Sequence, residues 1–173
     1  MNKKNQFKLI NQENNLTLRT IAQKDIEKIR VWKNAHRASF FYKEIINPEE
    51  QLKWFTEYQK RQNDFVFMIS YMNNDIGCTA FRELDEAMDI YNVILGDKSF
   101  GGKGLMSIAN SVMCSYMIDY FGKEITVKVL KTNPAIKWYL KNNFIEIDNM
   151  NDFVLFRLDY SHFKKIDYKF TAY

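Results

Sequence analysis

Gly96-Asp-Lys-Ser-Phe-Gly101-Gly102-Lys103-Gly104-Leu105-Met106 is a glycine-rich turn that follows a strand-like segment and opens an amphipathic helical pattern from about 103 to 121. Glycines let the backbone approach an anion closely, and the free N–H groups at a helix start attract it. Lys103 adds a formal charge. We therefore expect 101–106 to bind the phosphates of a nucleotide-like cofactor. A connection that binds no ligand is the alternative.

Two other phosphate-binding motifs fit this spacing poorly. A P-loop needs a glycine where Asp97 stands, and a Ser or Thr after the lysine, where Gly104 stands. A dinucleotide fingerprint needs an acidic residue at the end of the next strand, whereas Glu124 begins that strand. The spacing excludes the first motif and weakens the second.

The composition indicates one folded domain with a diffuse positive charge. With 173 residues, 46% hydrophobic and 16% aromatic, the chain can bury a substantial core, and no linker or repeat divides it. We expect a single domain over 1–173, with 1–14 as a flexible N-terminal extension. The net charge of +4 is spread along the chain, which suits an anionic ligand but not nucleic acid.

The sequence shows no metal-ligand spacing and no targeting segment. Cys78 and Cys114 are isolated, and the two histidines stand far apart, so we expect a reduced interior and no metal. The first six residues lack an apolar signal segment, and no uncharged apolar stretch is long enough to span a membrane. The expectation is a cytoplasmic protein without a membrane partner. A homodimer is compatible with the sequence, which does not fix the oligomeric state.

Hydrophobic periodicity predicts a regular order of strands and helices. Helical patterns begin after Ala22, at Asn47-Pro48, at about Lys103 and at Asn133-Pro134. The expected strands are apolar or alternating runs at 16–20, 65–72, 76–81, 89–95, 125–130, 144–147 and 153–158. Short polar turns separate the three strands between 65 and 95, which predicts an antiparallel meander.

In this order of elements the chain resembles the GNAT family of N-acetyltransferases over nearly its whole length. In that family the loop between the fourth strand and the third helix reads Gln/Arg-x-x-Gly-x-Gly/Ala and binds the pyrophosphate of acetyl-coenzyme A (acetyl-CoA). The segment 101–106 takes that place and keeps the central Gly104. The resemblance implies an α/β (α+β) fold, with a mixed, mostly antiparallel central sheet of about seven strands and four flanking helices. It implies a cofactor site at Leu95, Gly101, Gly102, Lys103, Gly104, Leu105, Met106 and Asn133.

A second match is Asn133-Pro-Ala135-Ile-Lys-Trp-Tyr139-Leu-Lys141-Asn-Asn143-Phe144, which is similar to the family's Asn-x-Ala/Ser-x-x-x-Tyr-x-Lys-x-Gly-Phe. By resemblance, Asn133 binds the pantetheine arm or helps to order the active site, and Tyr139 stands near the thioester sulfur. A phenol with a usual pKa of about 10 can protonate a thiolate whose conjugate acid has a pKa of about 8.5. Spacing alone favours a core position for Tyr139, and the resemblance reverses that preference.

The resemblance also implies a way to take a proton from the attacking amine, often a Glu on the fourth strand. Ile90 stands at that position, and alternation places Asp89 and Tyr91 on one face and Asn92 on the other. Asp89 is the candidate base. The alternatives are a water chain to backbone carbonyls, loss of the proton before binding, and a solvated acid at the strand start.

The residues before the meander resemble a subgroup that carries Arg-x-Trp-Arg-Asn, an aromatic turn and then Ile-x-x-Glu-Glu-His-x-x-Trp-Phe. Several members acetylate nucleotide-linked amino sugars, as in pseudaminic acid biosynthesis. Aromatic rings suit a sugar or base, and Arg30, Arg37 and Arg82 suit a diphosphate. The implied acceptor site comprises Trp32, Asn34, Arg37, Phe41, Tyr42, Arg82 and Asn92. Packing of Trp32, Trp54 and Phe55 between the two helices is the alternative.

Three functions follow. The first is acetyl transfer from acetyl-CoA to a small-molecule primary amine, preferably a nucleotide-linked amino sugar. It would proceed by direct attack in a ternary complex, because neither cysteine stands beside a histidine, with backbone N–H groups near Leu95 stabilising the oxyanion. The second is acetylation of a protein N-terminus, as in ribosomal-protein acetyltransferases. The third is a non-catalytic acyl-CoA sensor.

Overall fold

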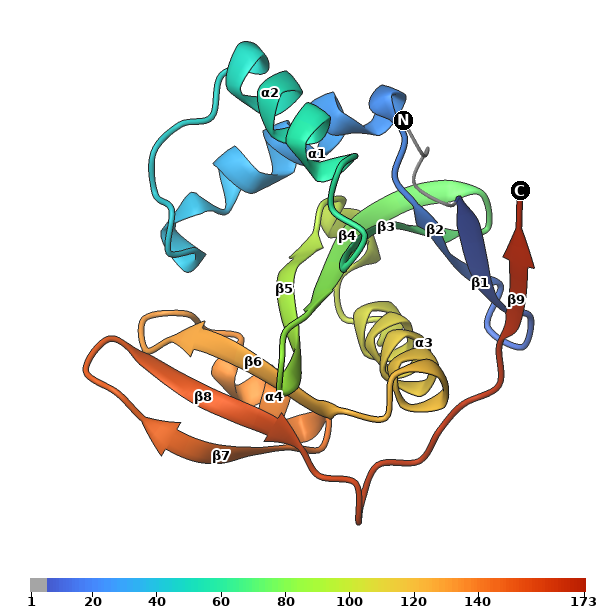
Figure 1. The fold of residues 1–173 in the computed structure, drawn as a ribbon, viewed down its shortest axis with the longest axis vertical. Helices are drawn as coiled ribbons and strands as arrows, with labels where there is room; N and C mark the ends of the chain where they lie inside the picture. Colours follow the sequence, from blue (N-terminus) through green and yellow to red (C-terminus); the bar gives the residue numbers. More distant parts are fainter. Residues whose placement is uncertain (1–5) are drawn as a thin grey trace.

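The computed structural model describes residues 6–173, which form a single sheet with helices on both faces (Figure 1). Within these residues the sheet has nine strands in the order β7-β8-β6-β5-β4-β3-β2-β1-β9. The strands are β1 Phe7–Asn11, β2 Leu16–Thr20, β3 Asp64–Tyr71, β4 Asn74–Glu83, β5 Ala87–Leu95, β6 Glu124–Leu130, β7 Phe144–Asn149, β8 Phe153–Leu158 and β9 Lys169–Ala172. Neighbouring strands are antiparallel except β5 and β6, which are parallel. The predicted meander, β3 to β5, is confirmed.

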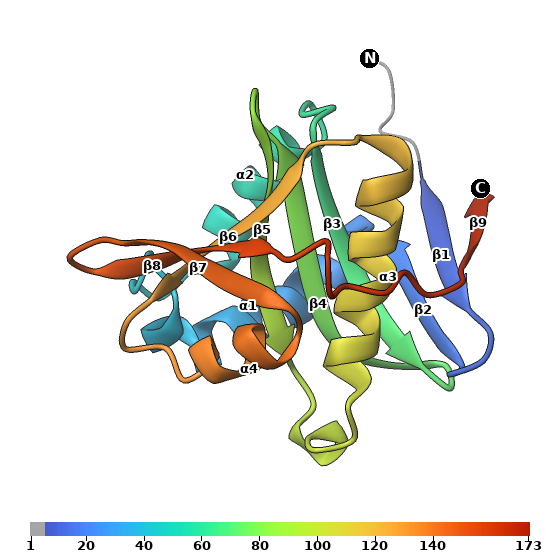
Figure 2. The same cartoon turned by 90° about the horizontal axis from the view of Figure 1, so that it is seen from below.

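Two helices lie on each face of the sheet (Figure 2). The helices are α1 Ile26–Ala35, α2 Pro48–Tyr58, α3 Leu105–Tyr120 and α4 Ile136–Lys141, with 3₁₀ turns η1 Gln23–Asp25, η2 Arg37–Ser39 and η3 Lys98–Phe100. One buried cluster joins the sheet to α3 and includes Phe67 and Phe81, and a second joins it to α1 and α2 and includes Ile29 and Phe55. Each fully buried side chain of this size contributes roughly 1.5–3 kcal/mol. No helix within residues 6–173 is long and apolar enough to cross a membrane.

The helix ends follow local sequence signals. Asn47 caps α2, because its Oδ1 accepts from the Glu50 N–H at 2.9 Å while the Glu50 carboxylate accepts from the Asn47 N–H at 2.8 Å. The third helix begins at Leu105, two residues later than expected, because Gly104 adopts a left-handed φ of 73° as its N-cap. Asn143 has a φ of 63° after α4, as expected for the residue that closes this helix.

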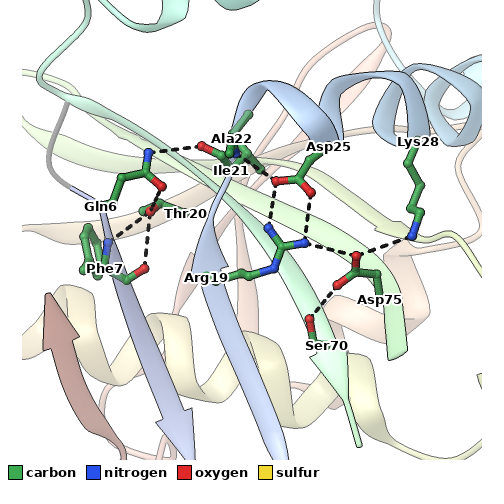
Figure 3. Close-up of polar contacts among 10 residues, drawn as sticks. All are labelled: Gln6, Phe7, Arg19, Thr20, Ile21, Ala22, Asp25, Lys28, Ser70 and Asp75. Atoms are coloured by element: carbon green, nitrogen blue, oxygen red, sulfur yellow. Dashed lines mark hydrogen bonds and ion pairs between the residues drawn. The ribbon is translucent and has the colours of Figure 1, made fainter. Parts of the chain in front are cut away.

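A network of charges anchors the start of α1 to the sheet (Figure 3). Arg19 of β2 donates from Nη1 and Nη2 to the two carboxylate oxygens of Asp25, at 2.7 and 2.9 Å, and from Nη2 to Asp75 at 3.0 Å. Ser70 donates to Asp75 at 2.7 Å, and Asp25 also accepts from the Ala22 N–H at 2.8 Å. These contacts fix where α1 crosses the sheet, and hence which of its side chains reach the site.

The predicted mixed, mostly antiparallel sheet with four flanking helices is confirmed, but the sheet has nine strands instead of about seven, because β1 and β9 were missed. Part of the expected flexible extension 1–14 forms β1, while the expectation for residues 1–5 lies outside the described residues. Phe7 and Leu9 point into the α3-side core, and β1 pairs with β2 on one side and β9 on the other. β9 lies some 160 positions along the chain from β1, and the pairing begins with Phe7 opposite Ala172. Local periodicity carries no signal for such a pairing.

Candidate active site

The two parallel strands separate at the centre of the sheet and leave a cavity between them. They are paired only from Ala87 to Ile90 on β5 and from Glu124 to Val127 on β6. Just beyond that point β5 bulges, and Asn92 takes a φ of 50° while its carbonyl accepts from the Cys78 thiol at 3.6 Å. The resulting cavity has a volume of about 850 Å³.

The glycine-rich turn and the start of α3 form one end of this cavity. Gly102 and Gly104 have φ values of 72° and 73°, and a Cβ at either position would meet no heavy atom within 4 Å. Among the described residues, the backbone N–H groups from Gly102 to Met106 find no hydrogen-bond acceptor. An open loop with free N–H groups at the start of a 16-residue helix is a site for phosphate oxygens. The residues present therefore fit the diphosphate of acetyl-CoA.

Most of the predicted cofactor residues line the cavity. They are Leu95, Gly101, Gly102, Gly104, Leu105, Met106 and Asn133. Lys103 does not line it, because its Nζ turns to the ring of Phe100, 5.0 Å from the centroid. The positive charge at this end comes from the helix terminus, with the lysine beside it.

Tyr139 lies in the cavity wall and is also part of the core. It is 5% exposed, and its ring packs on Phe144 and Phe156 at centroid distances of 5.4 and 6.2 Å. No hydrogen-bond partner of its hydroxyl is found in residues 6–173. Among these residues, the side-chain atoms that are both fully buried and unpaired belong to Asn110, so the Tyr139 hydroxyl is not fully buried. It therefore contacts the cavity that Tyr139 lines. Burial raises the pKa of Tyr139, and the charge of Asp89 adds to the effect. The group can therefore donate a proton at neutral pH.

Asn133 ties together two segments that line the cavity. Its Nδ2 donates to the Ser39 carbonyl at 3.1 Å, and its Oδ1 accepts from the Ala135 N–H at 2.9 Å. The side chain thus holds the turn after α1 against the start of α4. Of the two roles that the resemblance implied, this geometry supports the ordering of the site.

The rest of the cavity wall combines aromatic rings with positive charges. Phe41, Tyr42 and Asn92 line it as predicted, and Lys33 also does. Lys33 forms no ion pair among the described residues, and burial lowers the pKa of its ammonium. Further lining side chains, which were not among the predicted site residues, are Phe40, Tyr91, Lys128 and Phe153.

Asp89 and Arg82 also line the cavity and bind each other. The Arg82 Nη2 lies 2.7 Å from the Asp89 Oδ2, and Nε donates to the same oxygen at 2.9 Å. Asp89 is 6% exposed, so the solvated acid considered from the sequence is wrong. Asp89 as the base stays a prediction. The shared face expected for Asp89 and Tyr91 is confirmed, since Arg82 reaches both side chains.

Three residues predicted for the acceptor lie outside the cavity wall. Trp32 packs flat on Gly96, where a Cβ would come within 2.0 Å of the indole. Asn34 instead accepts from the Ile46 N–H and donates to the Ile46 carbonyl, both at 2.9 Å. Arg37 donates to the Asn34 carbonyl at 3.2 Å. Asn34 and Arg37 thus shape the α1–α2 connection, while Trp32 packs α1 against the end of β5.

Arg30, considered from the sequence for a diphosphate, also has a structural role. It pairs with Glu27 at 2.6 Å and donates to the Ile46 carbonyl at 2.9 Å. The residue that replaces it in the cavity is Lys33, one position beyond Trp32. Lys33 belongs to the Arg30–Asn34 run, but its cavity position could be predicted only from the orientation of α1 on the sheet. Phe153 and Lys128 had no local signal, because they reach the cavity through the pairing of β6 with β8.

Comparison with known proteins gives a family and a fold. Residues 15–142 match the family model described as an acetyltransferase (GNAT) domain. No match was found among curated proteins. Within residues 6–173, no group of three His, Cys, Asp or Glu side chains could hold a metal ion.

Three solved structures illustrate the shared fold. FdhC, described as a nucleotide-linked sugar GNAT, has a TM-score of 0.72 at 17% identity, over 93% of this chain and 91% of its own. RimL, a ribosomal L7/L12 alpha-N-protein acetyltransferase in complex with coenzyme A, has 0.70 at 17%, over 86% and 96%. Campylobacter jejuni N-acetyltransferase PseH in complex with acetyl-CoA has 0.65 at 19%, over 84% and 99%. At these identities the likeness concerns the fold alone.

Proposed function

Since the chain belongs to the acetyltransferase (GNAT) domain family, we propose that its acceptor is a primary amine that carries an anionic group, with a nucleotide-linked amino sugar as the preferred case. Family membership makes the chain an acetyl-CoA-dependent N-acetyltransferase. The acceptor is inferred from the residues that line the cavity. One observation carries it: apart from the glycine-rich turn, the cavity wall consists largely of aromatic rings and cationic side chains.

Charge separates the candidate acceptors. Lys33, Arg82 and Lys128 line the cavity, and the carboxylate that lines it among the described residues, Asp89, is already paired with Arg82. A polyamine would need carboxylates that are free to pair with its ammonium groups. An anionic acceptor would instead give Lys33 the counter-ion that it lacks among the described residues. The rings of Phe40, Phe41 and Tyr42 provide faces on which a sugar or base can stack.

Different residues of the chain would carry out different steps of the acetyl transfer. The loop 101–106 would hold the diphosphate of acetyl-CoA, which when bound supplies a thioester acyl group. Near Leu95 the backbone of β5 pairs with β4 but not with β6, and its edge toward β6 would face the acyl oxygen and donate to the negative charge that develops there. Tyr139 would give its proton to the departing sulfur, so that the amide forms as the carbon–sulfur bond breaks. The acceptor nitrogen attacks directly, without an acyl-enzyme.

Cysteine chemistry offers no alternative route through a covalent acyl-enzyme. Cys78 and Cys114 are buried, and burial raises the pKa of Cys78 to about 12, so neither thiol is an activated nucleophile. The remaining alternatives from the sequence are an N-terminal protein acetyltransferase and a sensor. A peptide acceptor would favour an acidic groove, and the basic aromatic cavity does not provide one. The free hydroxyl of Tyr139 supports a catalyst over a sensor.

A thiol-release assay tests this proposal. Purified protein, acetyl-CoA and a thiol reagent would be incubated with amino sugars, nucleotide-linked amino sugars, polyamines and short peptides. We expect acceptor-dependent release of coenzyme A to be fastest with a nucleotide-linked amino sugar. Faster release with a polyamine or a peptide would reject the proposed acceptor. If none of the acceptors in the panel caused release of coenzyme A, the catalytic assignment would be weakened.

A further inference from the structure

Arg82 lines the cavity and is held in place on two sides. The Nε–Nη2 edge of its guanidinium contacts the Asp89 Oδ2 at 2.9 and 2.7 Å. The centre of the guanidinium lies 5.0 Å from the centroid of the Tyr91 ring. The side chain as a whole is nevertheless 48% exposed. A cation that is fixed in position while facing an open cavity is prepared for a ligand.

The ring beneath Arg82 is itself anchored. The Tyr91 hydroxyl donates to the Asp64 carboxylate, and the Asp64 side chain is 5% exposed and pairs with Arg61 at 3.2 Å. Burial, together with the neighbouring charge of Asp64, raises the pKa of Tyr91. The hydroxyl therefore remains a donor at physiological pH, and the ring keeps its orientation.

The second edge of the Arg82 guanidinium, formed by Nη1 and Nη2, is directed away from Asp89. Among residues 6–173, Nη1 has no hydrogen-bond or ion-pair partner. The free edge of a guanidinium presents two parallel N–H donors, the arrangement that binds phosphate and carboxylate oxygens in a bidentate manner. Arg82 lines the cavity with Phe41 and Tyr42, so its ligand would be part of the acceptor.

We propose that Arg82 is the residue that selects acceptor amines bearing an anionic oxygen group, a diphosphate or a carboxylate, and that Asp64, Tyr91 and Asp89 act as its positioning residues. The inference rests on the proposed function in that it concerns the acceptor of the same transfer reaction. Asp89, the predicted base, here serves to orient Arg82. The acceptor then loses its ammonium proton before binding, and the second proton, which the nitrogen loses once it has bonded to the acyl carbon, leaves through water; both routes were considered from the sequence.

Matched acceptors and matched variants test the assignment. The acceptors are one amino sugar in its free form and the same sugar linked to a nucleoside diphosphate. Arg82→Met should raise the KM of the linked acceptor at least about tenfold, the loss of a charge-assisted bidentate contact, and change the KM of the free sugar less than about twofold. Arg82→Lys should recover part of the loss. The KM of acetyl-CoA should stay constant in both variants.

Tyr91 variants separate a positioning role from a purely structural one. Tyr91→Phe keeps the ring and removes the bond to Asp64, so it should raise the KM of the linked acceptor while leaving the free sugar unaffected. Tyr91→Leu should have a larger effect of the same kind. The control is Arg157→Met, which breaks an exposed ion pair with Glu124 outside the cavity and should change neither KM. Thermal unfolding of each variant would show that the fold is intact.

Inorganic pyrophosphate provides a test that does not depend on the identity of the acceptor. It should inhibit the wild type in competition with the acceptor at saturating acetyl-CoA, and Arg82→Met should weaken this inhibition about tenfold. If an anionic amine other than a nucleotide-linked sugar is the substrate and depends on Arg82, the proposed acceptor fails and the role of Arg82 stands. Equal effects of Arg82→Met on charged and uncharged acceptors, or inhibition that Arg82→Met leaves unchanged, would overturn the role of Arg82.

Discussion

Replacement of Tyr139 by Phe should separate its catalytic role from its packing role. The substitution removes one hydroxyl and keeps the ring on Phe144, Phe156 and Trp138, at centroid distances of 5.4, 6.2 and 4.9 Å. The hydroxyl has no partner among the described residues, so no internal hydrogen bond is lost. The free energy of unfolding should therefore change by less than about 0.5 kcal/mol.

The kinetic effect should be far larger than the effect on stability. General acid catalysis contributes roughly a hundredfold to ten-thousandfold, which corresponds to about 3–5 kcal/mol of transition-state stabilisation. Steady-state thiol release with the best acceptor would report kcat, and a binding titration would report the Kd of acetyl-CoA. We expect kcat to decrease by a factor within that range and the Kd of acetyl-CoA to stay constant. Because burial raises the pKa of Tyr139, the wild-type kcat should show no loss from its ionisation below about pH 10.

A matched control is available on α3. Tyr116 is also buried, at 6% exposure, and burial raises its pKa to about 12, but it does not line the cavity. Tyr116→Phe makes the same chemical change away from the site and should leave kcat unaltered. A kcat for Tyr139→Phe within about threefold of the wild type would refute the general-acid role and return Tyr139 to the core.

Three further predictions concern the loop, the α1 contact and acid stability. Gly104→Val should raise the Kd of acetyl-CoA about tenfold or more, because a β-branched residue is strained at a φ of 73° and would cover the free N–H groups; calorimetric titration measures it, and an unchanged Kd in a folded variant would contradict it. Gly96→Ala should destabilise the fold by about 1–3 kcal/mol in denaturant unfolding, since its Cβ would lie 2.0 Å from the Trp32 ring; an unchanged midpoint would disprove the close contact. Burial works to raise the pKa of Asp75, but the Ser70 hydrogen bond and nearby cations hold it below its usual value, so its stabilising effect is complete above about pH 4 and lost as the pH falls through the lowered pKa. Asp75→Asn should therefore flatten the loss of stability over that acid range, and an unaltered pH profile would argue against the network.

Local chemistry made several features of this fold predictable. The capped start at Asn47 and the left-handed residue Asn143 each depend on a few neighbouring residues. The meander from β3 to β5 depends on short polar turns between apolar runs. The same local signals placed the glycine loop at the site, because a strand, a glycine-rich turn and a helix start are consecutive in the chain.

Tertiary contacts decided what the sequence could not. Trp32 and Lys33 are neighbours on α1, and the sequence favoured Trp32 for the cavity. Trp32 lies instead on Gly96, which leaves room for an indole, and this contact turns Lys33 toward the cavity. In the same way, the ion pair of Arg82 with Asp89 arises from the pairing of β4 with β5, so a residue predicted for the acceptor and the predicted base bind each other.

The most direct test of the account compares one amino sugar with its nucleotide-linked form as acceptors for purified protein. Initial rates of acetyl-CoA-dependent thiol release would give kcat/KM for both, and mass spectrometry would locate the added acetyl group on the amine. We predict that the linked form has a kcat/KM at least about tenfold higher, from its contacts with Arg82 and Lys33. Equal values for the two acceptors, or a higher value for the free sugar, would contradict an acceptor site that selects anionic amines.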